Sequence, residues 1–136
     1  MEKESHYDFC VRCGWKDYID TMIVVDYIIL NRDRHGANIE VLRNARAHTL
    51  RIAPLFDHGL SLMYSCMTDE DVVAFDILED KRCQNFIGTY SCFDNLNLIK
   101  NRKNVFSGSL KPDDKKYIFI GLENVLSDVF IDKIWN

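Results

Sequence analysis

An apolar helical pattern that runs straight into a polar loop constrains this chain most. From Trp15 to Leu30 apolar residues recur every three or four positions, and the second half, Ile23–Leu30, is interrupted only by Asp26. A helix that is apolar on nearly all sides lies in the middle of a domain. The pattern therefore predicts a buried central helix, although its β-branched residues leave a strand as the competing interpretation.

The predicted helix is followed by two loops with a hairpin between them. The first loop, Asn31–Asn38, reads NRDRHGAN. Ile39–Arg43 and His48–Ala53 flank a short turn and predict a β-hairpin. Pro54 ends the second strand because it has no amide proton to donate to a ladder. The second loop begins there and carries Asp57, so the hairpin can fold the two loops together.

The two loops contain the side chains that phosphoryl transfer requires. Asn38 lies five positions after Asp33. Asp57 follows the hairpin and begins a turn pattern, Asp57-His58-Gly59. In such sites one carboxylate orients the attacking hydroxyl, while an amide oxygen and a second carboxylate hold Mg²⁺ against the phosphates of ATP. The order predicts Asp33 as catalytic, and Asn38 and Asp57 as ligands of the metal and nucleotide. The competing interpretation is ordinary turn residues, because Asp and Asn are favoured in turns.

Four further side chains in or near the loops have structural interpretations. Asp26 is expected to hydrogen-bond the backbone of the neighbouring loop, because an unpaired buried carboxylate is costly. Arg34 is expected to pair with a carboxylate, with an electrostatic role near phosphate as the alternative. His48 and His58 belong to no pattern and are expected to be ordinary residues.

The remaining segments of the first two thirds predict little regular structure. Residues 1–14 have the pattern of a short polar lead that ends at Gly14. The acidic stretch Thr68–Asp80 is expected to form a loop, with a short strand or turn at Val72–Phe75. Residues 81–91 are expected to be irregular.

Three helices are predicted in the last third of the chain. The first covers Phe93–Lys100, with a cap near Ser91. The second begins at Pro112, because proline suits the first turn and the acids that follow suit its positive end. Its predicted apolar stripe consists of Tyr117, Ile118, Leu122, Val125 and Leu126. Ser127 is expected to cap a last helix that runs to Trp135.

Composition indicates one soluble α+β domain over residues 1–136, mainly helical with one hairpin. Hydrophobic residues make up 47% and charged residues 28%, as in ordinary globular proteins. The net charge of −4 argues against a broad nucleic-acid surface, so no direct nucleic-acid binding is expected. The chain has no apolar run long enough to span a membrane. The N-terminus lacks the apolar core of a secretory signal.

The five cysteines favour reduced thiols in the cytoplasm, because their number is odd and no secretory signal is present. Cys10 and Cys13 have the spacing of a zinc knuckle, but a structural zinc site needs four ligands and no second pair exists. We therefore expect two half-buried thiols ahead of a helix.

The loop residues resemble a known kinase family. Asp33-Arg34-His35-x-x-Asn38 is similar to the catalytic loops of the HipA family of bacterial serine/threonine kinases and of phosphoinositide kinases. The later segment Ile52–Ser61, IAPLFDHGLS, resembles the Ala-Pro-aromatic-Asp segment and the following Leu-Ser of the HipA family. Phosphoinositide kinases more typically have Ile-Asp-Phe-Gly there. The resemblance extends from about Asp20 to Leu62.

This resemblance implies a protein-kinase-like C-terminal lobe with a β-hairpin between its catalytic and metal-binding loops. Asp33 would be the catalytic aspartate, and Asn38 and Asp57 would hold Mg²⁺ and ATP. His35 would be a second catalytic residue that contacts phosphate or shapes the loop by packing. The implied activity is phosphoryl transfer to Ser or Thr of a protein substrate, the chain itself included.

The sequence departs from a complete kinase in two respects. No glycine-rich G-x-G-x-x-G loop is present, and no Val-Ala-Ile-Lys-like strand precedes Asp33. We therefore expect the C-terminal lobe alone, nearly inactive until a partner supplies the N-terminal lobe. The surface facing that lobe would be partly apolar, so a homo-oligomer is also expected.

Two alternatives stay open at this point. The chain could be a non-catalytic kinase remnant that binds a protein partner, such as the DNA-binding antitoxin with which HipA-like proteins often associate. The acidic residues 69–80 would then face a basic partner, although a solvated loop explains them as well. A lipid-kinase lobe would need a basic surface, and the cluster Lys100, Arg102 and Lys103 is small.

Overall fold

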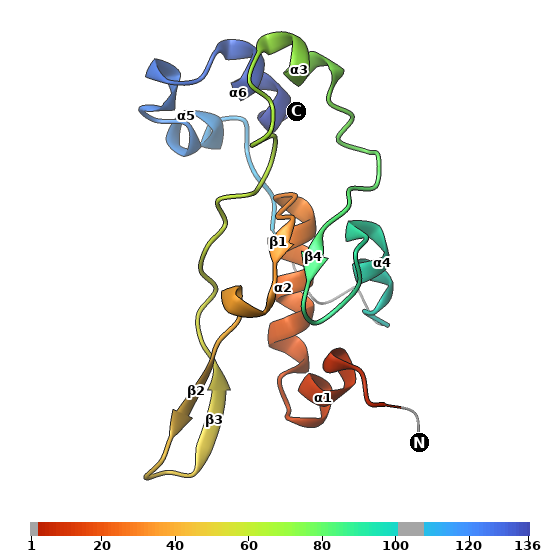
Figure 1. Ribbon diagram of the computed structural model, residues 1–136. Helices are drawn as coiled ribbons and strands as arrows, with labels where there is room; N and C mark the ends of the chain where they lie inside the picture. Colours follow the sequence, from red (N-terminus) through yellow and green to blue (C-terminus); the bar gives the residue numbers. More distant parts are fainter. Residues whose placement is uncertain (1–2, 101–107) are drawn as a thin grey trace. The chain divides into compact units, whose positions relative to one another are not determined.

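The computed structural model describes residues 3–100 and 108–136, and it has a small α+β fold. Most of its regular structure is helical, with two small two-stranded sheets, one of them a hairpin (Figure 1). Within the described residues no helix combines the length and the apolar character needed to cross a bilayer. The predicted basic residues Arg102 and Lys103 lie outside the described residues.

The chain divides into two compact units, each made of two segments. The first unit contains Met1–Ser61 and Asp80–Phe106, and the second contains Leu62–Glu79 and Ser107–Asn136. All the predicted site residues belong to the first unit. Whether the two units together form one domain, as the sequence predicts, stays a prediction.

Helix α1, His6–Arg12, replaces the polar lead predicted for the N-terminus. Ser5 caps it, because the Ser5 hydroxyl accepts a hydrogen bond from the Asp8 amide at 3.1 Å. Gly14, with φ of +80°, turns the chain after the helix. The prediction of a polar lead was wrong, because the segment buries Tyr7 in the core. The polar residues around Tyr7 gave no apolar pattern in the sequence.

Helix α2, Lys16–Ile28, confirms the predicted central helix and excludes the strand alternative. Its residues Ile19, Met22 and Ile23 are at most 1% exposed. The buried core of the first unit consists of Tyr7, Cys10, Ile19, Met22, Ile23, Ile87 and Ile99. Cys10 thus lies within a helix and in the core, and burial raises the pKa of its thiol.

A short parallel sheet links the first loop to a distant segment. Strand β1, Asp33–Arg34, pairs with β4, Gln84–Asn85, so that Asp33 lies opposite Gln84. The amide of Phe86 donates to the Arg34 carbonyl at 2.9 Å. Figure 1 shows the two strands side by side. Residues 81–91, predicted as irregular, therefore contain a strand that brings them beside the first loop.

The predicted hairpin is confirmed, with slightly shorter strands. Strands β2, Val41–Asn44, and β3, Thr49–Ile52, are antiparallel, and Val41 lies opposite Ile52. The Asn44 side-chain oxygen accepts the amides of Arg46 and Ala47, each at 3.0 Å, which closes the turn.

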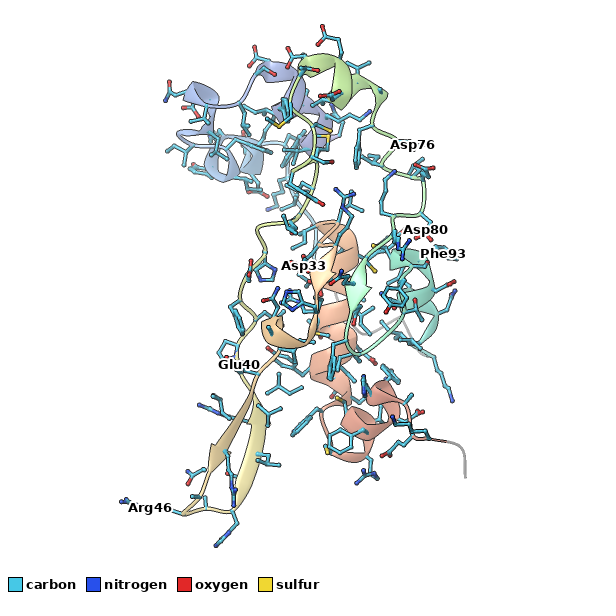
Figure 2. All side chains as sticks on the ribbon, viewed as in Figure 1. Asp33, Glu40, Arg46, Asp76, Asp80 and Phe93 are labelled. Atoms are coloured by element: carbon cyan, nitrogen blue, oxygen red, sulfur yellow. The ribbon has the colours of Figure 1, made fainter. Side chains whose placement is uncertain are left out.

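Helix α4, Cys92–Asn97, confirms the helix predicted near Ser91, although it ends three residues early. The Ser91 hydroxyl accepts from the Asp94 amide at 2.9 Å, as a cap does. Asp80 supports the same start, because it accepts from the Ser91 hydroxyl at 2.6 Å and the Phe93 amide at 2.8 Å. These bonds hold the pKa of the Asp80 carboxyl below its usual value. Figure 2 shows Asp80 and Phe93 beside each other there.

In the second unit, helix α3, Asp69–Ala74, corrects the loop and strand predicted for the acidic stretch. Thr68 and Asp71 form a reciprocal capping box, in which each side chain accepts from the other's backbone amide. The amides of Met67 and Thr68 lower the pKa of the Asp71 carboxyl. The acids at the start of the segment are therefore helix-starting residues.

Helix α5, Asp114–Ile118, begins just after Pro112 as predicted but is much shorter than its predicted stripe. A 3₁₀ turn, Leu122–Asn124, follows Gly121, whose φ is +82°. The proposed stripe is wrong, because this left-handed glycine changes the chain direction inside it. Tyr117 and Val125 are consequently 66% and 79% exposed.

Helix α6, Asp128–Trp135, confirms the last predicted helix and its cap. The Ser127 hydroxyl accepts from the Phe130 amide at 3.4 Å. The same hydroxyl donates to Asp69 at 2.5 Å, and Lys133 donates to the Val73 carbonyl at 3.4 Å. These contacts attach α6 to α3 within the second unit.

Gly88, in the loop after β4, provides a test of this packing. A Cβ at Gly88 would lie 2.2 Å from Asn95 Oδ1 and 2.9 Å from its Cγ. Asn95 is buried and cannot move aside easily, because its Oδ1 accepts from the Thr89 amide at 2.6 Å and the Thr89 hydroxyl at 3.0 Å. We expect Gly88→Ala to lower the free energy of unfolding by about 1–3 kcal/mol in urea denaturation.

Gly59→Ala is the matched control. A Cβ at Gly59 meets only Asp57 Oδ1, at an ordinary 3.6 Å. Its urea midpoint should stay close to that of the parent chain. Equal midpoints for the Gly88→Ala and Gly59→Ala variants would contradict the tight packing of the loop against Asn95.

Candidate functional site

The backbone of Asp33 is fixed by hydrogen bonds, while its carboxylate makes none in the described residues. The Asp33 amide donates to Asn31 Oδ1 at 3.2 Å, and β1 fixes the strand conformation. The side chain is 26% exposed. Within residues 3–100 and 108–136 its carboxylate accepts no hydrogen bond, and the basic group beside it is the His35 ring, whose Nε2 lies 3.7 Å from Asp33 Oδ1. Figure 2 shows Asp33 at β1.

His35 shapes the loop that contains Asp33. Its Nδ1 accepts from the Ala37 amide at 3.1 Å and caps the 3₁₀ turn Gly36–Asn38. A ring nitrogen that accepts carries no proton, so Nε2 is the nitrogen left as a donor. That Nε2 faces Asp33 Oδ1 at 3.7 Å. His35 thus contacts its own loop through a hydrogen bond, and both roles expected from the sequence, contact with phosphate and packing of the loop, stay predictions.

Asn38 is oriented so that its amide oxygen is free. The side-chain nitrogen donates to the Asp33 carbonyl at 2.8 Å, and the residue is only 5% exposed. In the described part of the chain the side-chain oxygen accepts no hydrogen bond. Because the nitrogen is already engaged, Asn38 presents an oxygen donor of the type that Mg²⁺ prefers.

A buried ion pair lies beneath these residues. Arg34 Nε donates to Asp26 Oδ2 at 2.9 Å, and Arg34 Nη2 to Asp26 Oδ1 at 2.7 Å. The two side chains are 1% and 6% exposed. The carboxylate partner expected for Arg34 is thus Asp26, in α2. The expectation for Asp26 was wrong, because its carboxylate bonds the Arg34 and Asn31 side chains rather than loop backbone.

Arg34 also joins the two predicted loops. Its Nη1 donates to the Asn38 carbonyl at 3.1 Å and to the Phe56 carbonyl at 2.8 Å. Its Nη2 lies 3.1 Å from His58 Nδ1, so His58 has a specific contact that the sequence did not predict. The residues on either side of Asp57 are therefore fixed to the loop that contains Asn38.

Asp57 itself has an uncommon backbone conformation. Its φ is +55°, in the left-handed region that few residues other than glycine adopt. Its Oδ1 accepts from the Gly59 amide at 3.4 Å, and the residue is exposed. Because Arg34 holds the neighbours Phe56 and His58, the unusual turn is imposed from both sides.

The donor set fits a magnesium–nucleotide site in its chemistry. Asn38 supplies one free amide oxygen and Asp57 one carboxylate, and both are hard donors. Among the described residues no group of three or more His, Cys, Asp or Glu side chains is arranged to hold a metal ion. A Mg²⁺ ion bound by few protein ligands and by nucleotide phosphates does not require such a group.

A pocket beside the first loop was missed by the sequence analysis. It has a volume of about 440 Å³ and is lined in part by His6, His35, Gln84, Phe86 and Tyr90. The His6 and Phe86 rings stack with centroids 4.2 Å apart. Phe86 lies close to Gly36, where a Cβ would be 3.2 Å from its ring. No local pattern in the sequence indicates this pocket, because it depends on the pairing of β1 with β4.

No protein-family model, curated protein or solved structure matches this chain. The geometry of the first unit is therefore what indicates a function.

Proposed function

We propose that this chain is the catalytic half of a kinase-like phosphotransferase, the C-terminal lobe of a HipA-like protein kinase. The reaction would be Mg²⁺- and ATP-dependent transfer of a phosphoryl group to Ser or Thr of a protein substrate, the chain itself included. One observation supports the proposal. The buried Arg34 guanidinium binds the carbonyls of Asn38 and Phe56, and so links the loop that contains Asp33 to the segment that contains Asp57.

Each residue has a role that suits its surroundings. Asp33, whose carboxylate accepts no hydrogen bond in the described residues, would align the acceptor hydroxyl and take its proton. His35 would order the loop that presents this carboxylate, because its Nδ1 accepts a hydrogen bond from the Ala37 amide. Asn38 and Asp57 would hold Mg²⁺ and, through it, the phosphates of ATP. Bound Mg²⁺ would supply positive charge to the phosphates during transfer.

A nucleotide lobe from another polypeptide segment is part of this proposal. Kinase sites hold the nucleotide with a glycine-rich loop and a strand lysine, and this sequence has neither pattern. Loss of a single electrostatic donor costs roughly 3–4 kcal/mol of barrier stabilisation in other enzymes. The chain alone would therefore transfer phosphate very slowly.

A non-catalytic module that binds a protein partner, such as an antitoxin-like protein, is the second candidate. Exposed apolar side chains of the second unit favour it: Val73, Ile120, Val125 and Leu78 are 70%, 75%, 79% and 91% exposed. The acidic stretch supports it less than the sequence suggested, because Asp69 and Asp71 are engaged in contacts at helix starts.

Calorimetric titration of Mg²⁺ with a non-hydrolysable ATP analogue separates the two candidates. The parent chain should bind the pair, and Asp57→Asn should weaken the affinity for Mg²⁺ by about tenfold or more, because a charged ligand is lost. Asp113→Asn is the matched control, since the Asp113 side chain is 90% exposed and lies in the second unit.

Two outcomes would contradict the phosphotransferase proposal. One is a folded parent chain that binds no nucleotide, with or without a nucleotide-lobe polypeptide. The other is equal affinity for the parent and the Asp57→Asn variant. The first outcome would favour the partner-binding module.

A further inference from the structure

The β2–β3 hairpin is a local basic site on an acidic protein. Between Val41 and Ile52 it contains three arginines and no Asp or Glu. The rest of the chain then has fourteen basic and twenty-one acidic residues. The hairpin is therefore a basic segment within an otherwise acidic chain.

The three arginines, Arg43, Arg46 and Arg51, are exposed and unpaired. None of their side chains makes a hydrogen bond or ion pair within residues 3–100 and 108–136. Other arginines differ: Arg12 bonds Glu4 through two nitrogens, and Arg34 bonds Asp26. Figure 2 shows Arg46 at the tip of the hairpin, directed away from the ribbon.

These arginines line a groove that also contains an apolar side chain. The groove has a volume of about 590 Å³, and Leu42, Asn44 and Thr49 complete much of its lining. In the strand register Leu42 lies opposite Arg51, and Leu50 lies opposite Arg43. Leu42 and Leu50 are 38% and 53% exposed, so Arg51 and Arg43 each have an uncovered apolar neighbour.

The hairpin has free backbone edges on both sides. Within the described residues β2 and β3 pair only with each other. Two-stranded hairpins without further strands are marginally stable in water, and their edges readily accept another strand. Its base is fixed, because the Ala53 amide donates to the Glu40 carbonyl at 2.8 Å and Tyr18 donates to the Ala53 carbonyl at 2.6 Å. A partner would therefore bind a fixed template.

We propose that this hairpin is the docking site for an acidic, extended polypeptide segment of a partner protein, which adds to it as a third strand. Backbone hydrogen bonds would satisfy a free edge. Carboxylates would pair with Arg43, Arg46 and Arg51, and apolar side chains would cover Leu42 and Leu50. A nucleic-acid backbone would satisfy the arginines but leave the leucines in water, so the exposed leucines favour a polypeptide.

A segment docked on the hairpin would lie near the candidate site. The hairpin joins the loop that ends at Asn38 to the loop that contains Asp57. A bound segment would lie along the hairpin without occupying either loop. The docking does not require phosphoryl transfer, so it can be tested in the absence of nucleotide.

The test uses a short fluorescein-labelled peptide that repeats Glu-Glu-Val-Val, so that an added strand presents both residue types on each face, and follows its fluorescence anisotropy with the full chain. The peptide should bind, and a variant with Arg43→Gln, Arg46→Gln and Arg51→Gln should bind about tenfold more weakly, or less well still. The control variant carries Lys100→Gln, Lys111→Gln and Lys116→Gln, an equal change in net charge at exposed lysines. It should bind the peptide like the parent chain.

Circular dichroism must show both variants folded, which is expected because the substituted side chains are exposed. A Leu42→Ser variant should also bind the peptide more weakly, because the groove loses the apolar side chain of Leu42. Three results would overturn the proposal: no binding by the parent chain, equal losses in the arginine and lysine variants, or a short DNA duplex that binds more tightly than the peptide. The last would identify the hairpin as a nucleic-acid contact instead.

Discussion

Arg34→Met will lower the free energy of unfolding by about 3–5 kcal/mol, because it leaves the buried Asp26 carboxylate without its partner. The Arg34 and Asp26 side chains are 1% and 6% exposed, and two hydrogen bonds of 2.9 Å and 2.7 Å join them. The substitution also removes the donors to the Asn38 and Phe56 carbonyls, at 3.1 Å and 2.8 Å. Urea denaturation followed by circular dichroism measures the loss.

A second substitution shows whether the loss comes from the stranded charge. Adding Asp26→Leu to Arg34→Met removes the unpaired carboxylate and should restore part of the stability, because apolar pairs often replace buried ion pairs at little cost. Order in the two loops should not return, since the Asn38 and Phe56 carbonyls still lack their donor. Hydrogen exchange across residues 31–38 and 54–60 reports that order. A single Arg34→Met variant as stable as the parent would show that the pair is not buried as described.

Asp33→Asn should reduce phosphoryl transfer by about 10²–10⁴-fold while leaving Mg²⁺–nucleotide affinity nearly unchanged. In the proposed mechanism Asp33 acts on the acceptor hydroxyl, whereas Asp57 and Asn38 hold the metal. Asparagine keeps the shape of the side chain but cannot accept the proton. Transfer of labelled γ-phosphate to protein is measured together with nucleotide binding, in the presence of a polypeptide that supplies the nucleotide lobe.

Comparing two variants separates a role in catalysis from a role in metal binding. Asp57→Asn should lose both binding and transfer, whereas Asp33→Asn should lose only transfer. Asp113→Asn, in the second unit, should match the parent in both assays. If the Asp33→Asn variant transferred phosphate at the parent rate, Asp33 would not be the catalytic aspartate.

Local sequence patterns predicted the elements whose signals lie within a few residues of one another. The central helix, the hairpin, and the helices capped by Ser91 and Ser127 are confirmed, because periodicity and capping are local properties. Local patterns misled where composition concealed a cap. The acids of α3 suggested a solvated loop, although the same residues form a capping box.

In the candidate site, too, local features follow from the sequence and long-range contacts do not. The sequence by itself determined the residue types of the two loops, Asn31–Asn38 and the segment around Asp57, and with them the chemistry they could perform. Only the tertiary structure decided that Arg34 joins these loops to Asp26, and that β4 pairs with β1. Such contacts join residues far apart in the chain, and they are selected by burial and by the need to pair buried charge, which no local pattern encodes.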